Sequence, residues 1–163
     1  MNPKFKLITM IIKIEQTTDY DVISRLNESV QTIHNRLFPE EFKKFDINSA
    51  TEFFKKILIS NHSYAFVAIV DSVPVGYILC LLKTRKENEF QYEKKLLYID
   101  QISINEEFRK LGIGKQLMTK AIELAQLLHV EEIQLDHWVR NEEASGFFQK
   151  MGFEYYNFKM KKS

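Results

Sequence analysis

Apolar residues alternate with polar ones in several short segments of the chain, and elsewhere they recur at every third or fourth position. Alternation favours strands that bury one face, whereas the wider spacing favours amphipathic helices. Short continuous apolar runs between turn residues favour fully buried strands. On these criteria we expect strands at Met10–Thr17, Tyr64–Val70, Val75–Leu82, Leu96–Asn105, Glu132–Val139 and Phe153–Met160.

Helical spacing fills most of the segments between these strands. We expect a helix that is capped by Asp19 and stops before Pro39, a helix that begins near Asp46–Ser49, and helices at Gly112–His129 and Glu142–Met151. Asp71–Pro74 is typical of a hairpin turn. The charged segment Thr84–Lys95 has no period and is expected to be a loop or frayed strand ends.

The resulting order, β-α-α-β-β-β-α-β-α-β, predicts a mixed sheet with helices on both faces, at the border of the α/β and α+β classes. No repeat, low-complexity tract or linker divides the 163 residues, so we expect a single domain over residues 1–163.

Composition and charge narrow the classes of partner. Hydrophobic residues make up 45% and charged residues 28%, and the net charge is +1, which gives no general attraction to nucleic acid or to an acidic membrane. The basic clusters Lys83–Lys86 and Lys159–Lys162 are interpreted as solvated surface. The apolar run Leu7–Ile12 is too short for a membrane span or a signal peptide.

Cysteine and histidine usage suggests neither a disulfide nor a metal site. Cys80 is the single cysteine, which excludes an internal disulfide and fits the reducing cytoplasm, where we expect the protein to be. The four histidines have no ligand spacing, so no metal site is expected.

The most informative segment runs from Ile99 to Lys115, where an apolar strand leads through an acidic turn into a basic, glycine-bearing loop that opens a helix. The unpaired N–H groups at a helix start, at the positive end of its dipole, suit a phosphate. A Walker A loop would need glycine in place of Arg109 and serine or threonine in place of Gln116. A dinucleotide fingerprint would need a small residue in place of Leu117.

What remains is R-x-x-G-x-G, carried by Arg109, Gly112 and Gly114, and a second segment, Asn141–Phe153. The first resembles the coenzyme A pyrophosphate loop of the GNAT superfamily of N-acetyltransferases. The second resembles the family's N-x-x-A-x-x-F-Y-x-K-x-G-F signature, with Phe148 in the tyrosine position. The resemblance is strong over the C-terminal half of the chain and loose over the N-terminal half, where the family builds acceptor specificity.

The resemblance implies the GNAT-like acyl-CoA N-acyltransferase fold, with a central mixed, mostly antiparallel sheet, and acetyl-CoA as co-substrate. It also implies that the pantetheine arm lies in a gap between two strands that separate at a bulge. The implied cofactor-binding residues are Ile102, Ser103, Ile104, Arg109, Lys110, Leu111, Gly112, Ile113, Gly114, Lys115, Asn141 and Phe148. A purely structural role is the alternative to cofactor binding for several of these residues: a tight basic turn for the loop, a helix cap for Asn141, and core packing for Phe148.

Two positions concern the chemical step. The acceptor amine must lose a proton, so a general base is useful. Asp100 is the nearest carboxylate on the strand, and alternation places it on the side of Ile102 unless a bulge intervenes. The alternative is that Asp100 is only a polar residue of the strand. The family's tyrosine can protonate the leaving thiolate, which Phe148 cannot; Tyr155, Tyr156 or water are the candidate substitutes, and a thiolate is a fair enough leaving group that the reaction can also do without one.

The sequence therefore predicts an N-acetyltransferase that acts on a small-molecule or peptide amine by direct transfer. A non-catalytic CoA-binding module of the same fold is the alternative. The acceptor cannot be identified from the sequence, and the family allows a homodimer.

Overall fold

The computed structural model describes residues 10–162. Along the chain these residues form β1 (Ile12–Thr17), α1 (Tyr20–Leu37), α2 (Ile47–Ile57), β2 (Ser63–Val70), β3 (Val73–Arg85), β4 (Lys94–Ile104), the short 3-10 helix η1 (Glu106–Phe108), α3 (Ile113–Leu127), β5 (Ile133–Leu135) and α4 (Glu142–Lys150).

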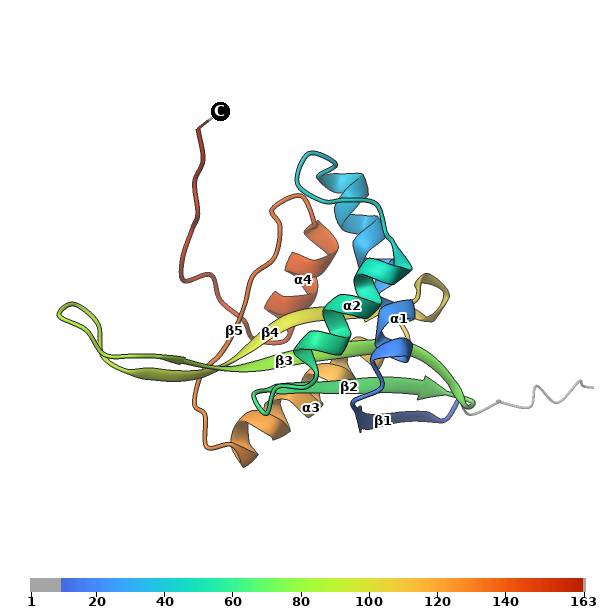
Figure 1. Ribbon diagram of the computed structural model, residues 1–163, viewed down its shortest axis with the longest axis horizontal. Helices are drawn as coiled ribbons and strands as arrows, with labels where there is room; N and C mark the ends of the chain where they lie inside the picture. Colours follow the sequence, from blue (N-terminus) through green and yellow to red (C-terminus); the bar gives the residue numbers. More distant parts are fainter. Residues whose placement is uncertain (1–9, 163) are drawn as a thin grey trace, which may run out of the picture.

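The described strands form a five-stranded sheet in the order β1-β2-β3-β4-β5 (Figure 1). Neighbouring strands from β1 to β4 are antiparallel, and β5 is parallel to β4. Helices α1 and α2 cover one face of the sheet and α3 covers the other (Figure 1). This architecture confirms the expected fold class, a mixed, mostly antiparallel sheet between helices.

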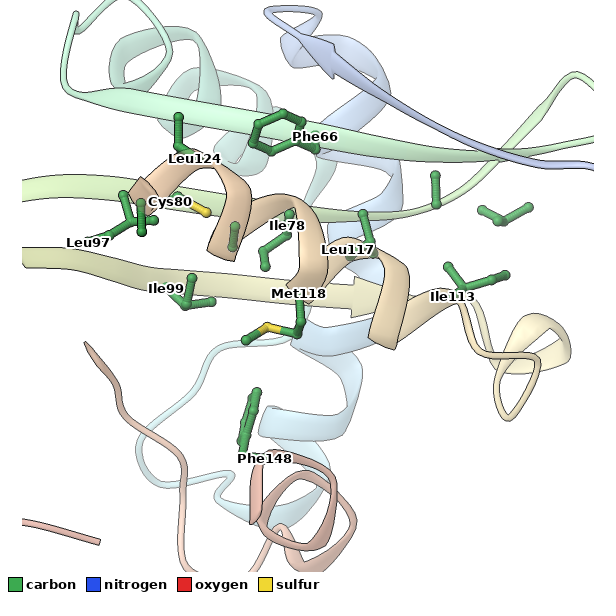
Figure 2. Close-up of a cluster of buried hydrophobic side chains, with 14 of the residues drawn as sticks. Phe66, Ile78, Cys80, Leu97, Ile99, Ile113, Leu117, Met118, Leu124 and Phe148 are labelled. Atoms are coloured by element: carbon green, nitrogen blue, oxygen red, sulfur yellow. The ribbon is translucent and has the colours of Figure 1, made fainter. Parts of the chain in front are cut away.

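Two hydrophobic clusters hold these layers together. The larger lies between the sheet and α3, where Leu117 and Met118 face sheet residues such as Ile78 and Ile99 (Figure 2). Its helical members recur with the spacing expected of an amphipathic helix. The smaller cluster joins α1 and α2 to the opposite face. The two sheet faces are thus buried by different helices.

Strand β4 is irregular at the middle of the sheet. Its pairing with β3 passes from Ile99 opposite Cys80 to Gln101 opposite Leu79, so that Asp100 is the extra residue of a β-bulge. On its other edge β4 pairs with β5 only over Leu97–Ile99 and then continues alone to Ile104. The two strands therefore separate where the bulge lies, as the resemblance implies.

Two expectations about the strands were wrong. The strand expected at Glu132–Val139 is only Ile133–Leu135, and residues 153–160 form no strand. A strand needs a partner edge for its N–H and C=O groups, and the three residues of β5 offer too short an edge. Side chains hold this tail instead: the Tyr155 hydroxyl lies 2.5 Å from Ser145 Oγ, and Gln134 Nε2 donates to the Tyr156 hydroxyl at 3.2 Å.

The segment Thr84–Lys95 combines both expected alternatives. Its ends continue the β3–β4 ladder, with Thr84 opposite Lys95 and Arg85 opposite Lys94, and only residues 86–93 form the loop. The result is a two-stranded arm that extends beyond the rest of the sheet (Figure 1).

Candidate functional site

The N-terminus of α3 is open, unlike the starts of the other α-helices in residues 10–162. Asp19, Asp46 and Asn141 each accept a hydrogen bond from a first-turn backbone N–H of α1, α2 and α4. At α3 the N-cap is Gly112, and none of the described side chains caps it. The first N–H groups of an α-helix have no partner within the helix, so those of α3 are available to an external acceptor.

The loop before α3 keeps this helix start clear. Gly112 has φ +80°, in the left-handed region that favours glycine, and a Cβ added there would meet no described atom within 4 Å. Lys110, at φ +60°, and Lys115 are exposed beside it. Two lysine charges and the positive end of the helix dipole therefore surround an open arc of backbone N–H groups, which favours an anion.

The other loop residues of the implied cofactor site face different environments. Leu111 is exposed, whereas the side chain of Ile113 is buried in the larger cluster. A Cβ on Gly114 would lie 3.2 Å from Ile104 Cδ1 and 3.2 Å from Phe147 Cζ. Gly114 therefore allows α3 to pack closely on β4 and α4, and only its backbone faces the loop.

The guanidinium of Arg109 bonds to the protein itself. Its Nε donates to the Ile104 carbonyl at 3.2 Å, and its Nη2 donates to Ser29 Oγ at 2.9 Å. In this structure the side chain of Arg109 thus braces the loop against β4 and α1.

Beyond the bulge, one backbone edge of β4 has lost its neighbour. Asn105 N–H donates to the Val75 carbonyl of β3 at 2.8 Å. Because the backbone groups of a strand alternate in direction, those of Ile102 and Ile104 point away from β3, towards the gap that β5 leaves. The hydroxyl of Ser103 is buried and donates to the Leu26 carbonyl of α1 at 2.8 Å. Ile102 and Ile104 therefore offer backbone groups to an extended ligand, while the Ser103 side chain anchors α1.

Asp100 lies on the face of α1 and α2, not on the side of Ile102. Gln101, with which it hydrogen-bonds, accepts from the buried Tyr77 hydroxyl of the smaller cluster at 2.5 Å, whereas Ile102 packs against the larger cluster. The bulge reverses the simple alternation. Burial raises the pKa of the Asp100 carboxyl, and the ammonium of Lys83 and the bond to Gln101 oppose that rise. A half-buried carboxylate with a raised pKa suits a general base.

Tyr98 stands between two carboxylates near the same gap. Its hydroxyl donates to Asp136 Oδ2 at 2.8 Å, and the Lys83 ammonium lies 3.3 Å from its ring centroid. Burial, the bond to Asp136 and the charge of Asp100 all raise the pKa of Tyr98. Tyr98 therefore stays protonated at neutral pH.

Helix α4 borders the gap that β5 leaves. Asn141 Oδ1 accepts from Ala144 N at 3.2 Å, so Asn141 caps α4, which is the structural alternative expected for it. Phe148 is 7% exposed and points towards Met118 of α3 (Figure 2). Phe148 is therefore a core residue, which is the structural alternative expected for it.

Tyr155 is linked to Phe148 through a shared aromatic neighbour. The imidazole of His137 connects the two aromatic rings, with centroids 6.3 Å from Phe148 and 5.5 Å from Tyr155. The Tyr155 side chain is about half exposed. Tyr156 lies further towards solvent at 74% exposure, which makes Tyr155 the better substitute for the acid.

Three aromatic side chains, Phe38, Phe42 and Trp138, form a cluster with Arg140 against it, which we call the aromatic wall. The Trp138 ring lies 4.9 Å from the ring centroids of both Phe38 and Phe42. Arg140 sits over Phe38 and donates to the Leu37 carbonyl at 2.9 Å. The wall joins the loop after α1 to the loop before α4.

No activated nucleophile and no metal centre emerges from the part of the chain that the structure describes. Cys80 is buried in the larger cluster, and burial raises the pKa of its thiol to about 12, which keeps it protonated. Among residues 10–162, no three histidine, cysteine or carboxylate side chains gather to hold a metal ion. No helix in this range is long and apolar enough to cross a membrane.

Sequence reasoning missed three residues of this region. A Cβ on Gly76 would lie 2.7 Å from the Ser103 carbonyl oxygen, and a glycine inside a strand is a known sign of such close approach. Trp138 fell inside the expected strand Glu132–Val139 and did not stand out from it. Ser29 gave no signal, because a serine on the polar side of a helix is usually solvated.

Fold and site together define an α/β protein with an open phosphate-type helix start beside a strand whose neighbour has separated. The chain belongs to the acetyltransferase (GNAT) family, whose model matches residues 27–153.

Relatives and solved structures agree with this family. An N-alpha-acetyltransferase of Sulfurisphaera tokodaii is 27% identical over 146 residues, covering 88% of this chain and 79% of that protein. An uncharacterized N-acetyltransferase of Methanocaldococcus jannaschii is 30% identical over 102 residues, covering 63% of this chain but only 44% of the relative. The BH1408 protein from Bacillus halodurans, as a tetramutant, has a similar fold, with a TM-score of 0.85, 22% identity and coverage of 94% and 99% of the two chains.

Proposed function

We propose that this chain is an acetyl-CoA-dependent N-acetyltransferase that transfers the acetyl group directly to a primary amine. The observation that carries the proposal is the uncapped start of α3, with its open Gly112, beside the free edge of β4. An anion site next to an unpaired strand edge matches a ligand that has a pyrophosphate and an amide-bearing arm. Family membership supports the reaction class.

In this proposal each part of the site has one task. Acetyl-CoA supplies the acetyl group as a thioester. The N–H groups of residues 110–115 hold its pyrophosphate, and the backbone of Ile102 and Ile104 holds its pantetheine arm. Asp100 accepts the proton of the acceptor amine, whose nitrogen bonds to the acetyl carbon as the carbon–sulfur bond breaks and CoA leaves as thiolate. No covalent enzyme intermediate is required, because no activated nucleophile is present among the described residues.

The acceptor is a primary amine of a small molecule or a peptide. It would enter on the face of α1 and α2, between Asp100 and the aromatic wall. The S. tokodaii relative is named an N-alpha-acetyltransferase, and one protein of similar fold is an aminoglycoside N-acetyltransferase solved with CoA (TM-score 0.70, 18% identity, 94% and 95% of the two chains). Peptide N-termini and aminoglycosides therefore both belong among the candidate acceptors to be tested.

The chain would act as a single N-acetyltransferase domain in the cytoplasm, where the free thiol of Cys80 is stable. A homodimer remains compatible with this function.

Millimolar CoA should raise the melting temperature of the protein by several degrees. A ligand present at about 100 times its Kd stabilises the folded state by about 2.7 kcal/mol, which corresponds to several degrees for a domain of this size. Differential scanning fluorimetry with CoA, acetyl-CoA and adenosine as a control checks this. An unchanged melting curve with both CoA compounds would contradict the proposal.

The second candidate function is a non-catalytic CoA-binding module, favoured by one observation, the buried Phe148 in the position of the usual acid. Release of free CoA thiol from acetyl-CoA in the presence of peptides, polyamines and aminoglycosides distinguishes the two. Binding without thiol release for any amine would identify the module.

Replacement of Phe148 by tyrosine should raise turnover by less than about tenfold, since a thiol with a pKa of about 8.5 is already a fair leaving group. The gain should be largest at low pH, where departure of the thiolate most needs a proton, and CoA affinity should stay the same. Turnover and Kd of F148Y, compared with those of Tyr155→Phe, check this. A gain of about a hundredfold or more would contradict the view that protonation matters little here.

A further inference from the structure

Ser29 closes a ring of hydrogen bonds with Ile104 and Arg109, which lie 75 and 80 residues further along the chain, at the start of the loop of residues 109–115. Ser29 Oγ of α1 donates to the Ile104 carbonyl at 3.1 Å. Arg109 donates to the same carbonyl through Nε at 3.2 Å and to Ser29 Oγ through Nη2 at 2.9 Å. The ring therefore links α1, the end of β4 and the first residue of the loop.

Each acceptor in the ring is occupied. The Ile104 carbonyl accepts two hydrogen bonds, and a carbonyl oxygen has two lone pairs. It is therefore not free to accept a bond from a ligand in the gap, which leaves the N–H of Ile104 and the backbone groups of Ile102. The serine hydroxyl is used both as donor and as acceptor, so its orientation is fixed.

The ring lies where the chain turns sharply. Arg109 follows η1, and the next residue, Lys110, has φ +60°, an uncommon conformation for a residue with a side chain. A planar guanidinium that donates in two fixed directions can hold this turn, whereas a single ammonium cannot reproduce both bonds.

Helix α1 is attached to the same stretch of β4 at two more places. The Ser103 hydroxyl donates to the Leu26 carbonyl at 2.8 Å, and Asn27 Nδ2 donates to Gln101 Oε1 at 3.1 Å. These bonds attach β4 to α1 in the stretch beyond Ile99, where β4 no longer pairs with β5. The ring extends this attachment from the strand to the loop.

We propose that Arg109 and Ser29 are positioning residues for cofactor binding, and that Arg109 acts through this ring and not as a ligand of the pyrophosphate. The inference rests on the proposed function, because it concerns the same CoA site. The helix that borders the acceptor side thereby sets the shape of the phosphate loop.

The test is a double-mutant cycle on the Kd for CoA, measured by isothermal titration calorimetry. Ser29→Ala should weaken CoA binding about fivefold and Arg109→Met about tenfold, since each removes bonds of a charged group that shapes the loop. The double variant should bind no more weakly than Arg109→Met alone, because both changes open one ring. Arg109→Lys should be as weak as Arg109→Met.

Matched variants separate positioning from folding. Ser24→Ala removes a hydroxyl of the same helix that bonds only to the Tyr20 carbonyl, at 2.5 Å, and should leave the Kd unchanged. Ser29→Thr keeps the hydroxyl and should keep the affinity within about twofold. If Arg109→Met does not fold, the contrast between Ser29→Ala and Ser29→Thr decides the question.

A neutral Ser29→Ala, together with an Arg109→Lys that retains affinity, would overturn the inference and make Arg109 a direct phosphate ligand. Additive losses in the double variant would overturn it as well. In both cases the proposed function stands, since the unmodified chain binds CoA. Failure of the unmodified chain to bind CoA would overturn both.

Discussion

Gly112→Asp should weaken CoA binding by about a hundredfold or more while the protein remains folded. The added carboxylate would sit at the open start of α3, where the pyrophosphate is proposed to bind. A negative charge about 5 Å from one phosphate charge costs about 3 kcal/mol at the effective dielectric of a protein surface. Calorimetric titration with CoA measures the loss.

Two controls separate charge from backbone strain. Gly112→Asn has nearly the same shape and tolerates the left-handed conformation equally well, but it is neutral, so it should lose much less affinity. Gly152→Asp, after α4, places the same residue at φ +89°, where an added Cβ would likewise meet no non-neighbouring described atom within 4 Å, and it should bind CoA normally. If Gly112→Asp binds as tightly as Gly152→Asp, the loop is a structural turn. Gly114→Asp is no substitute for this test, because its Cβ would crowd Phe147 and Ile104.

Asp100→Asn should lower kcat by about a hundredfold or more, the usual effect of removing a general base, and leave the Kd for CoA unchanged. A base must be ionised, so activity should fall as the pH drops through the pKa of Asp100. Because burial raises that pKa, the fall should begin at a higher pH than for an exposed aspartate. In Asp100→Asn this limb of the kcat/KM profile should disappear, and only the titration of the acceptor amine should remain.

Asp136→Asn is the matched control. Asp136 is a neighbouring carboxylate that accepts a bond from Tyr98, and it is not proposed to take a proton from the acceptor. Its removal should change kcat by less than about tenfold. Equal effects of the two variants, or an unchanged pH profile in Asp100→Asn, would show that Asp100 is only a polar residue of the strand.

Local patterns were sufficient for most of the fold. Elements whose sequence signal lies within a few residues formed where they were expected. These are α3 with its apolar stripe, the helices that begin after Asp19 and near Asp46, and the strands β2 and β3 with their apolar runs. The turn before α3 could be predicted for the same reason, because glycine marks such turns, and Gly112 does occupy a left-handed position at the helix start.

Features that depend on distant partners could not be predicted. Residues 153–160 have the alternation of a strand, but whether they pair depends on the length of β5, which sequence spacing does not define. The bulge at Asp100 moves a carboxylate to the other face of the sheet, and alternation alone would place it on the wrong side. The hydrogen bond from Arg109 to Ser29 spans 80 residues of chain, and no motif encodes it.

The missing cap of α3 has a consequence for how this chain can evolve or be engineered. A side-chain cap is worth about 1 kcal/mol of helix stability relative to alanine and a few tenths relative to glycine, and the other described α-helices each have one. An aspartate cap at this helix start would stabilise the empty protein by accepting from the N–H groups that the cofactor is proposed to use, and its charge would repel the pyrophosphate. Stability and affinity therefore oppose each other at this position, so selection for heat resistance alone would be expected to erode binding.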